Sequence, residues 1–152
     1  MSRKYKITTQ SIEWGNKKLF RIQAVKSFGD VKVNDLGGYI EDESNLSQDG
    51  NSWVYDEAMV FDNAEIYGNA KVYDNASVCN SAKVGGDAKV FGTAIVFDRA
   101  WIFDEAKVYG RARIFGDAEI FGSAEIYGNA KVYDNSKVHG TTLIFGNARI
   151  GS

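Results

Sequence analysis

The sequence predicts an all-β fold in which one chain winds into a triangular, single-stranded parallel β-helix of five to six coils, preceded by a β-hairpin cap. Three observations predict it: an uninterrupted six-residue repeat, small or turn-forming residues at fixed places in each repeat, and the absence of proline from all 152 residues. Stacked strands exclude proline because almost every backbone N–H is needed for pairing.

The repeat begins at Val54 and places Val or Ile at every sixth position up to Ile150, seventeen positions in all. We call these seventeen residues the anchors. Two residues before each anchor stands a small residue, which is Ala at fourteen places and otherwise Ser52, Ser136 or Thr142. Two residues after each anchor stands Gly, Asp, Asn or, once, Ser, as in "AEIYGNAKVYDNA".

A helix does not fit this period, because anchors about 600° apart would drift around its surface without forming a stripe. A strand fits, since residues two apart share a face and the Ala and the anchor therefore point inward together. Gly, Asp and Asn then form the corner, because they tolerate the left-handed backbone conformation. Three sides close a coil of about 18 residues, and coils spaced by about 4.8 Å make a prism roughly 26 Å tall.

Residues 52–151 resemble the hexapeptide-repeat left-handed β-helix proteins, whose motif is an aliphatic residue, variable positions and then a small residue. The texture "NAKVYDNA" and the leader "LFRIQAVKSFGDVKVNDLGGYIEDESNLS" are similar to repeat proteins that are common in bacteriophage and prophage genomes. Those proteins are often described as acyltransferases or as polymer-forming proteins. The resemblance implies a fold more directly than a function.

Residues 1–50 are expected to form an N-terminal cap and a first irregular coil, with the regular β-helix occupying residues 51–152. "KYKITTQSIEW" and "KKLFRIQAV" flank Gly15-Asn16 and indicate a β-hairpin. The irregular coil is expected from about residue 38, because Ile40 and Leu46 already follow the aliphatic spacing. Leu46 and Val54 are eight residues apart, which indicates a two-residue bulge. A docking module is the alternative role for this segment.

Composition predicts a soluble protein of a reducing cytoplasm, with no membrane and no nucleic acid among its partners, and the resemblance implies that this is the cytoplasm of a bacterial host cell. The formal net charge is −2 with mixed signs, so no basic footprint for DNA or for an anionic membrane is expected. The polar start "MSRKYKITTQ" does not resemble a signal peptide. The single cysteine, Cys79, has no partner for an internal disulfide and fits a reducing compartment.

The resemblance also raises the question of an acyltransferase. Enzymes of this fold use a histidine as general base, a loop that interrupts the coils, and acyl-CoA bound between subunits of a trimer. His139 is the one histidine, and it occupies an outward aromatic position in the regular repeat "SKVHGT". We therefore expect no catalytic residue unless His139 serves an acyltransferase, and we expect no cofactor. No metal site is expected either, because Asp56 and Asp74 are ordinary turn residues.

The residue after each anchor points outward, so equivalent residues of successive coils should form three aromatic columns. Their members are Tyr55, Tyr73, Phe91, Tyr109, Tyr127 and Phe145; then Phe61, Cys79, Phe97, Phe115 and Tyr133; then Tyr67, Gly85, Phe103, Phe121 and His139.

Cys79 and Gly85 interrupt two of these columns in one coil, which predicts a notch there. The next coil carries Ile95 and Trp101 where other repeats mostly have charged residues, beside Phe97 and Phe103. We expect these six residues to form a partner-binding site, because Trp and Phe are enriched at binding hot spots. The alternative is sequence drift at tolerant outward positions.

The last repeat is expected to promote self-association through Ile144, Phe145 and Ile150. An uncovered strand edge invites pairing with another chain, so an end-to-end dimer is expected, or a trimer as in the related enzymes. The alternative is that Gly151, Ser152 and Arg149 protect this edge.

The function expected from the sequence is therefore non-catalytic. We expect a protein that binds another protein or assembles with itself, including interference with a host factor or defence system. Two alternatives remain: an acyltransferase that uses acyl-CoA, and a protein that binds a small ligand or glycan through its aromatic columns.

Overall fold

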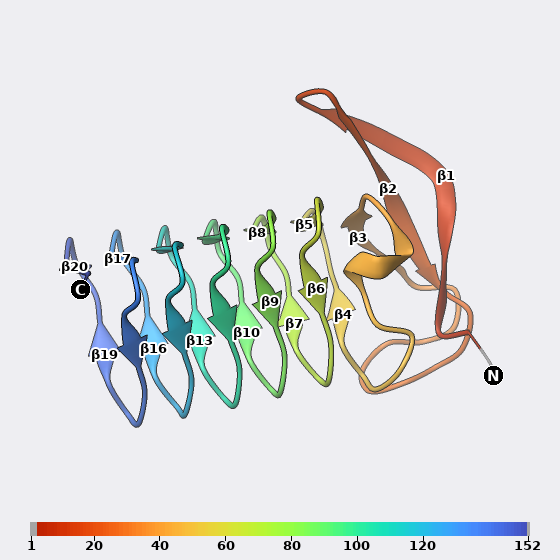
Figure 1. Cartoon of the computed structure of the whole chain (residues 1–152). Coiled ribbons are helices and arrows are strands. Elements are labelled where there is room, and N and C mark those ends of the chain that lie inside the picture. The colour runs from red at the N-terminus through yellow and green to blue at the C-terminus, as the bar shows by residue number, and fades with distance from the viewer. Residues whose placement is uncertain (1–2, 152) are drawn as a thin grey trace.

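The chain forms an all-β solenoid, shown in Figure 1 as a computed structural model that describes residues 3–151. Within this range the only helical element is a single short 3-10 turn, η1 (Glu43–Asn45). The N-terminal hairpin stands at one end of the row of coils, and the chain ends at the other (Figure 1). The predicted all-β class and the stacked parallel coils are confirmed.

Each repeat contributes a strand of two residues, an outward residue followed by the anchor, and these strands form three faces. Face 1 contains β5 (Met59–Val60), β8 (Ser77–Val78), β11 (Ile95–Val96), β14 (Arg113–Ile114), β17 (Lys131–Val132) and β20 (Arg149–Ile150). Face 2 contains β4 (Trp53–Val54), β7 (Lys71–Val72), β10 (Lys89–Val90), β13 (Lys107–Val108), β16 (Glu125–Ile126) and β19 (Leu143–Ile144). Face 3 contains β6 (Glu65–Ile66), β9 (Lys83–Val84), β12 (Trp101–Ile102), β15 (Glu119–Ile120) and β18 (Lys137–Val138).

The core is a column of aliphatic side chains that stack from coil to coil. Val96 pairs in parallel register with Val78 on one side and Ile114 on the other, and all three have no exposed surface. Ala94 and Ala112 are equally buried where the chain turns into this face. Burial of apolar surface, at about 25 cal/mol per Å², therefore stabilises the contacts between neighbouring coils.

Each corner contains one residue in the left-handed region, two positions after the anchor. Glycine occupies most of these positions, but Asp56, Asp74 and Asp98 adopt φ of 56–58° there. Their carboxylates accept a hydrogen bond from a backbone N–H one coil further on, as Asp98 Oδ2 does from Gly116 at 2.9 Å. The Asp side chain thus offsets part of the cost of its backbone conformation by linking adjacent coils.

The predicted hairpin is confirmed. β1 (Tyr5–Trp14) pairs antiparallel with β2 (Lys17–Ala24) around a turn in which Gly15 has φ of 64°. β2 then pairs antiparallel with β3 (Leu36–Ile40), and β3 pairs parallel with β5, so the hairpin extends face 1. The division into residues 1–50 and 51–152 stays a prediction.

The irregular coil also follows the sequence expectation. Ile40 pairs with Val60, and Leu46 pairs with Ile66. In each of these two pairs the partners are two residues further apart in the sequence than in the regular pair of Val78 with Val96. This longer separation confirms the predicted two-residue insertion between Leu46 and Val54.

A buried lysine closes the N-terminal end of the solenoid. Lys4 Nζ donates to the backbone oxygen of Ser52 at 2.8 Å, and to those of Asp49 and Gly50 at 3.3 and 3.4 Å. The ammonium also lies 5.0 Å from the ring centre of Phe28. Burial lowers the pKa of Lys4 from 10.5 to about 8. The side chain supplies donors to carbonyl groups that have no coil on their N-terminal side within residues 3–151.

Candidate interaction surface

The four apolar residues predicted to bind a partner lie together on two adjacent sides of one coil. Ile95 and Phe97 lie on face 1, and Trp101 and Phe103 follow on face 3. Trp101 is 39% exposed, whereas Ile95, Phe97 and Phe103 are half-buried. The rings of Trp101 and Phe103 contact each other with centroids 4.5 Å apart and planes tilted by 39°.

The predicted notch at Gly85 is wrong, because the ring of Tyr67 fills it. A Cβ at position 85 would lie 2.2 Å from Tyr67 Cζ, and Gly85 is buried. Trp101 Nε1 donates a hydrogen bond to the Tyr67 hydroxyl at 2.8 Å. Tyr67 therefore spans the coil that lacks a ring and joins the aromatic group on the next coil. We call Tyr67, Ile95, Phe97, Trp101 and Phe103 the aromatic belt.

The interruption at Cys79 is partly covered as well, from the N-terminal side. Leu19 of β2 packs with Tyr39 and Phe61 in a second small apolar cluster on the outside of face 1, and Cys79 borders this cluster. Burial raises the pKa of the Cys79 thiol to about 11, with smaller contributions from nearby Asp62 and Asp98. A thiol with a raised pKa is a poor nucleophile, so Cys79 is not suited to covalent catalysis.

Elsewhere the predicted columns are stacks of rings, except that Tyr55 meets Tyr73 edge-on with planes 80° apart. On face 2, Tyr73, Phe91 and Tyr109 lie with ring centroids 4.7 Å apart and planes within 6° of parallel. On face 1, Phe97 and Phe115 stack at 4.9 Å. Rings stacked in this way turn their faces toward each other and their edges toward solvent. Such columns stiffen the prism, with each pair contributing several tenths of a kcal/mol.

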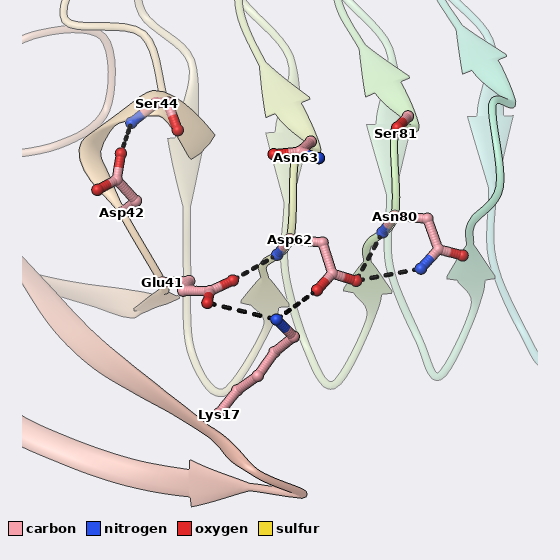
Figure 2. Close-up of a pocket in the computed structure, with 8 residues that line it drawn as sticks. All are labelled: Lys17, Glu41, Asp42, Ser44, Asp62, Asn63, Asn80 and Ser81. Carbon is pink, nitrogen blue, oxygen red and sulfur yellow. Dashed lines mark hydrogen bonds and ion pairs between the residues drawn. The ribbon is translucent and has the colours of Figure 1, made fainter.

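A polar cleft of about 750 Å³ lies between the hairpin and the corner that follows face 1, and the sequence did not predict it. Figure 2 shows Lys17, at the end of the hairpin, reaching toward Glu41 and Asp62. Lys17 Nζ lies 2.8 Å from Asp62 Oδ1 and 3.4 Å from Glu41 Oε2. The backbone N–H of Asp62 donates to Glu41 Oε1 at 2.7 Å.

The charged groups of this cleft satisfy one another. The hydrogen bond to Asp62 raises the pKa of Lys17. Burial opposes ionisation of Asp62, but hydrogen bonds from Lys17 and Asn80 outweigh it and hold the pKa of Asp62 below its usual value. Asn80 donates to Asp62 Oδ2 from its backbone at 3.0 Å and from its amide at 3.1 Å (Figure 2). The cluster is therefore a latch that holds the hairpin against the coils.

His139 lies at the end of the face 3 column and is exposed. Its ring stacks on Phe121 with centroids 5.4 Å apart. Its backbone oxygen accepts a hydrogen bond from the Thr142 hydroxyl at 2.8 Å, and its ring makes no hydrogen bond with residues 3–151. The groups that would orient an imidazole as general base are not assembled around it within this part of the chain.

The acidic turn residues have a structural role. Asp56 Oδ2 accepts a hydrogen bond from the backbone N–H of Asp74 at 3.1 Å. Across residues 3–151 there is no group of three or more His, Cys, Asp or Glu side chains placed to hold a metal ion.

The residues predicted to mediate self-association lie on the final coil. Phe145 is 55% exposed and Ile150 is 36% exposed, whereas Ile144 remains buried in the core stack. Leu143 adds a further exposed side chain beside them. The strands β18, β19 and β20 end the three faces of the described solenoid. Self-association through these residues stays a prediction.

Comparison with known proteins gives one partial similarity. No protein-family model matches the chain. The chain is 38% identical over 63 residues to the "Uncharacterized acetyltransferase YdcK" of Escherichia coli (strain K12), which covers 36% of this chain and 19% of that protein. The match thus spans about a fifth of the relative's length. The described residues contain no helix with the length and apolar character that a membrane span requires. The stacked coils and the partial match together fit a hexapeptide-repeat β-helix.

Proposed function

We propose that this solenoid acts as a non-catalytic protein that binds a protein partner through its aromatic belt. The observation that carries the proposal is the position of Trp101. It stands at an outward strand position that is Lys or Glu in the neighbouring coils of face 3, namely Lys83 and Glu119. An exposed indole at this position contributes nothing to the packing of the core.

The belt is also held in a fixed geometry. The hydrogen bond from Trp101 to Tyr67 and the contact with Phe103 restrain the indole before any partner arrives. A side chain that is already ordered loses less conformational entropy on binding. Exposed, restrained aromatic residues are the usual hot spots of protein interfaces.

The test is the substitution Trp101→Lys, with Leu143→Lys as a matched control. Both changes replace an exposed apolar residue at an outward strand position by lysine. We expect Trp101→Lys to keep the wild-type melting temperature and to weaken partner binding by about 30-fold, the effect of a hot spot of about 2 kcal/mol. Partners captured from a bacterial lysate are identified by mass spectrometry, and their affinities for each variant are then measured.

Equal binding by wild type and Trp101→Lys would exclude the belt as the interface. Loss of self-association in Leu143→Lys alone would instead assign the interaction to the final coil and to Phe145 and Ile150. The phage or prophage origin, the bacterial cytoplasm as location and interference with a host factor belong to the same proposal. They are supported by the resemblance of the repeat to such proteins.

Acetyl transfer is the second candidate, because the partial relative is named an acetyltransferase. His139 is the residue that would act as base in that case. We expect no turnover of acetyl-CoA by the wild-type protein, measured as thiol release over a panel of amine and hydroxyl acceptors. Turnover that His139→Ala abolishes would replace the binding proposal by the enzyme.

A further inference from the structure

The charges of the solenoid are segregated around its axis although the protein is nearly neutral. Residues 87–149 contain eight cationic and eight acidic side chains. Six of the cationic residues lie on face 1, on face 2 or on the corner between them, and we call this set the basic ridge. Its members are Lys89, Lys107, Arg111, Arg113, Lys131 and Arg149.

Acidic residues of the same coils lie mostly at the other two corners. Asp98, Asp117 and Asp134 follow face 1, and Asp104 and Glu105 follow face 3. From Gly92 onward the corner between face 2 and face 1 has no acidic residue. Glu125 is the one carboxylate among the ridge residues, and it accepts a hydrogen bond from the Tyr109 hydroxyl at 2.9 Å.

Most ridge residues have a like charge as their neighbour in register, and only Lys107 has a carboxylate, Glu125, beside it. Arg113, Lys131 and Arg149 are direct neighbours in parallel register on face 1. Like charges in register destabilise a sheet. None of the six ridge side chains forms an ion pair among residues 3–151, whereas Lys83 of face 3 pairs with Glu65. The fold thus tolerates an unfavourable arrangement that an acidic ligand would relieve.

The ridge also contains an apolar stripe between two rows of cations. Within one coil, "KVYGRAR" directs Lys107, Tyr109, Arg111 and Arg113 outward in that order. Tyr109 belongs to the ring column of Tyr73, Phe91 and Tyr127. From Lys107 to Arg111 the chain spans about 13 Å or less. This width matches an α-helix of about 10–12 Å diameter, whose apolar stripe repeats at about the spacing of the coils.

We propose that the basic ridge docks an acidic amphipathic helix of a partner protein, lying parallel to the solenoid axis. The apolar stripe of the helix covers the ring column, and glutamates or aspartates on either side meet the two rows of cations. A nucleic acid fits less well, because the stacked rings present edges and give bases no face on which to stack. This inference rests on the proposed binding function and adds the chemistry of the partner.

The probe is a fluorescein-labelled helical peptide of five turns, with a leucine stripe flanked on both sides by glutamate. Its binding to the full chain is measured by fluorescence anisotropy at low ionic strength. We expect binding that weakens with salt, and no binding of a peptide in which lysine replaces every glutamate. Lys107→Gln combined with Lys131→Gln should weaken binding about fivefold, which is the loss of two exposed ion pairs.

The matched control combines Lys83→Gln with Lys137→Gln. These lysines occupy the same outward strand position on face 3, and the change in net charge is identical. We expect this variant to bind the acidic peptide like the wild type. Melting temperatures of both double variants show that each is folded.

Three results would overturn the inference: no binding of the acidic peptide, an equal loss in the control variant, or tighter binding of a single-stranded oligonucleotide through the same lysines. The last result would assign the ridge to nucleic acid. Trp101 lies outside the ridge. If Trp101→Lys weakens partner binding but the acidic peptide does not bind, the ridge inference fails and the proposed function stands. Partner binding that survives both Trp101→Lys and the ridge variant would reject both.

Discussion

A single residue decides the shape of every corner, and at many corners it is an aspartate with positive φ. The sequence predicts the turn, because Asp, Asn and Gly tolerate this conformation. It does not predict that the Asp carboxylate reaches the next coil, as Asp74 Oδ2 does toward the N–H of Gly92 at 3.0 Å. That contact requires the coil spacing to be known. Aspartate at these corners therefore forms the turn and also hydrogen-bonds to the next coil.

Lys4 gives the protein an unusual response to alkali. Its pKa is lowered to about 8 in the folded protein and is 10.5 when the chain is unfolded, so the native state binds fewer protons between these values. Stability from this group therefore rises with pH in that window. We expect the free energy of unfolding to increase by about 1 kcal/mol between pH 8 and 9, measured by urea denaturation. Lys4→Met should show no such increase.

The pH range of this experiment is limited by Cys79 and by tyrosines whose pKa burial raises, among them Tyr5, Tyr55 and Tyr109. Burial raises the pKa of Cys79 from 9.0 to about 11, so ionisation of this thiol in the unfolded chain lowers stability as the pH rises through 9 and offsets part of the gain from Lys4. The pKa of Tyr109 is raised to about 12, first by burial and then by its hydrogen bond to Glu125, which has the same effect above pH 10. A wild-type curve that falls between pH 8 and 9 would contradict the assignment to Lys4.

At the scale of the strand, each side is too short to fold alone and depends on its neighbours in the adjacent coils. Strands of two residues have no stability of their own, and the aromatic columns add contacts on the outer surface. Gly85 shows what happens when one column lacks a ring. The neighbouring Tyr67 leaves the column, lies across the glycine and reaches Trp101.

The substitution Gly85→Tyr tests this arrangement. The new Cβ would lie 2.2 Å from Tyr67 Cζ, so tyrosine does not fit while Tyr67 keeps its present position. Tyr67 must therefore return to the column, and Trp101 loses its hydrogen-bond partner. We expect the melting temperature to change by no more than a few degrees, because a new stack replaces the lost contact. The emission of Trp101 should shift to longer wavelength as the indole becomes more mobile and exposed.

Trp101→Phe in the same background provides the control, since Trp14 and Trp53 remain and any shift must then disappear. An unchanged spectrum in Gly85→Tyr would show that Trp101 does not depend on Tyr67.

The contrast between these elements shows what the sequence makes predictable. The sides, the corners and the two-residue insertion after Leu46 were predicted because every repeat has the same surroundings, so one repeat explains the others. The latch between Lys17, Glu41 and Asp62 was not predicted, because it joins residues far apart in the chain. Their contact depends on the angle at which the hairpin meets the coils. The position of Tyr67 had a weak signal, namely a glycine at the equivalent place in the next coil that leaves space for its ring.

At the scale of the whole molecule, stability is a sum of interfaces between adjacent coils. Val96 lies near the middle of the stack, where a carboxylate would have no partner. We expect Val96→Asp to lower the free energy of unfolding by more than about 3 kcal/mol. Because the change breaks the contacts with the coils on both sides, urea unfolding should also become less cooperative, with a lower m-value.

Ile95→Asp is the matched control, since it places the same carboxylate one position away on the outer surface. We expect a loss of less than about 1 kcal/mol and an unchanged m-value. If the two variants unfold alike, the alternation of inward and outward residues along β11 is incorrect.

The hairpin differs from the coils in one further respect, because its strands pair with residues close by in the chain. β1 meets β2 through a turn, whereas each coil must complete a full circuit of the three faces before it gains a partner. During translation the hairpin and β3 leave the ribosome before the coils, and their exposed edge is then ready to receive β5. Every later coil finds a finished surface on which to stack. We therefore expect the solenoid to assemble in the direction of its synthesis, with the hairpin and β3 as the first surface on which a coil stacks.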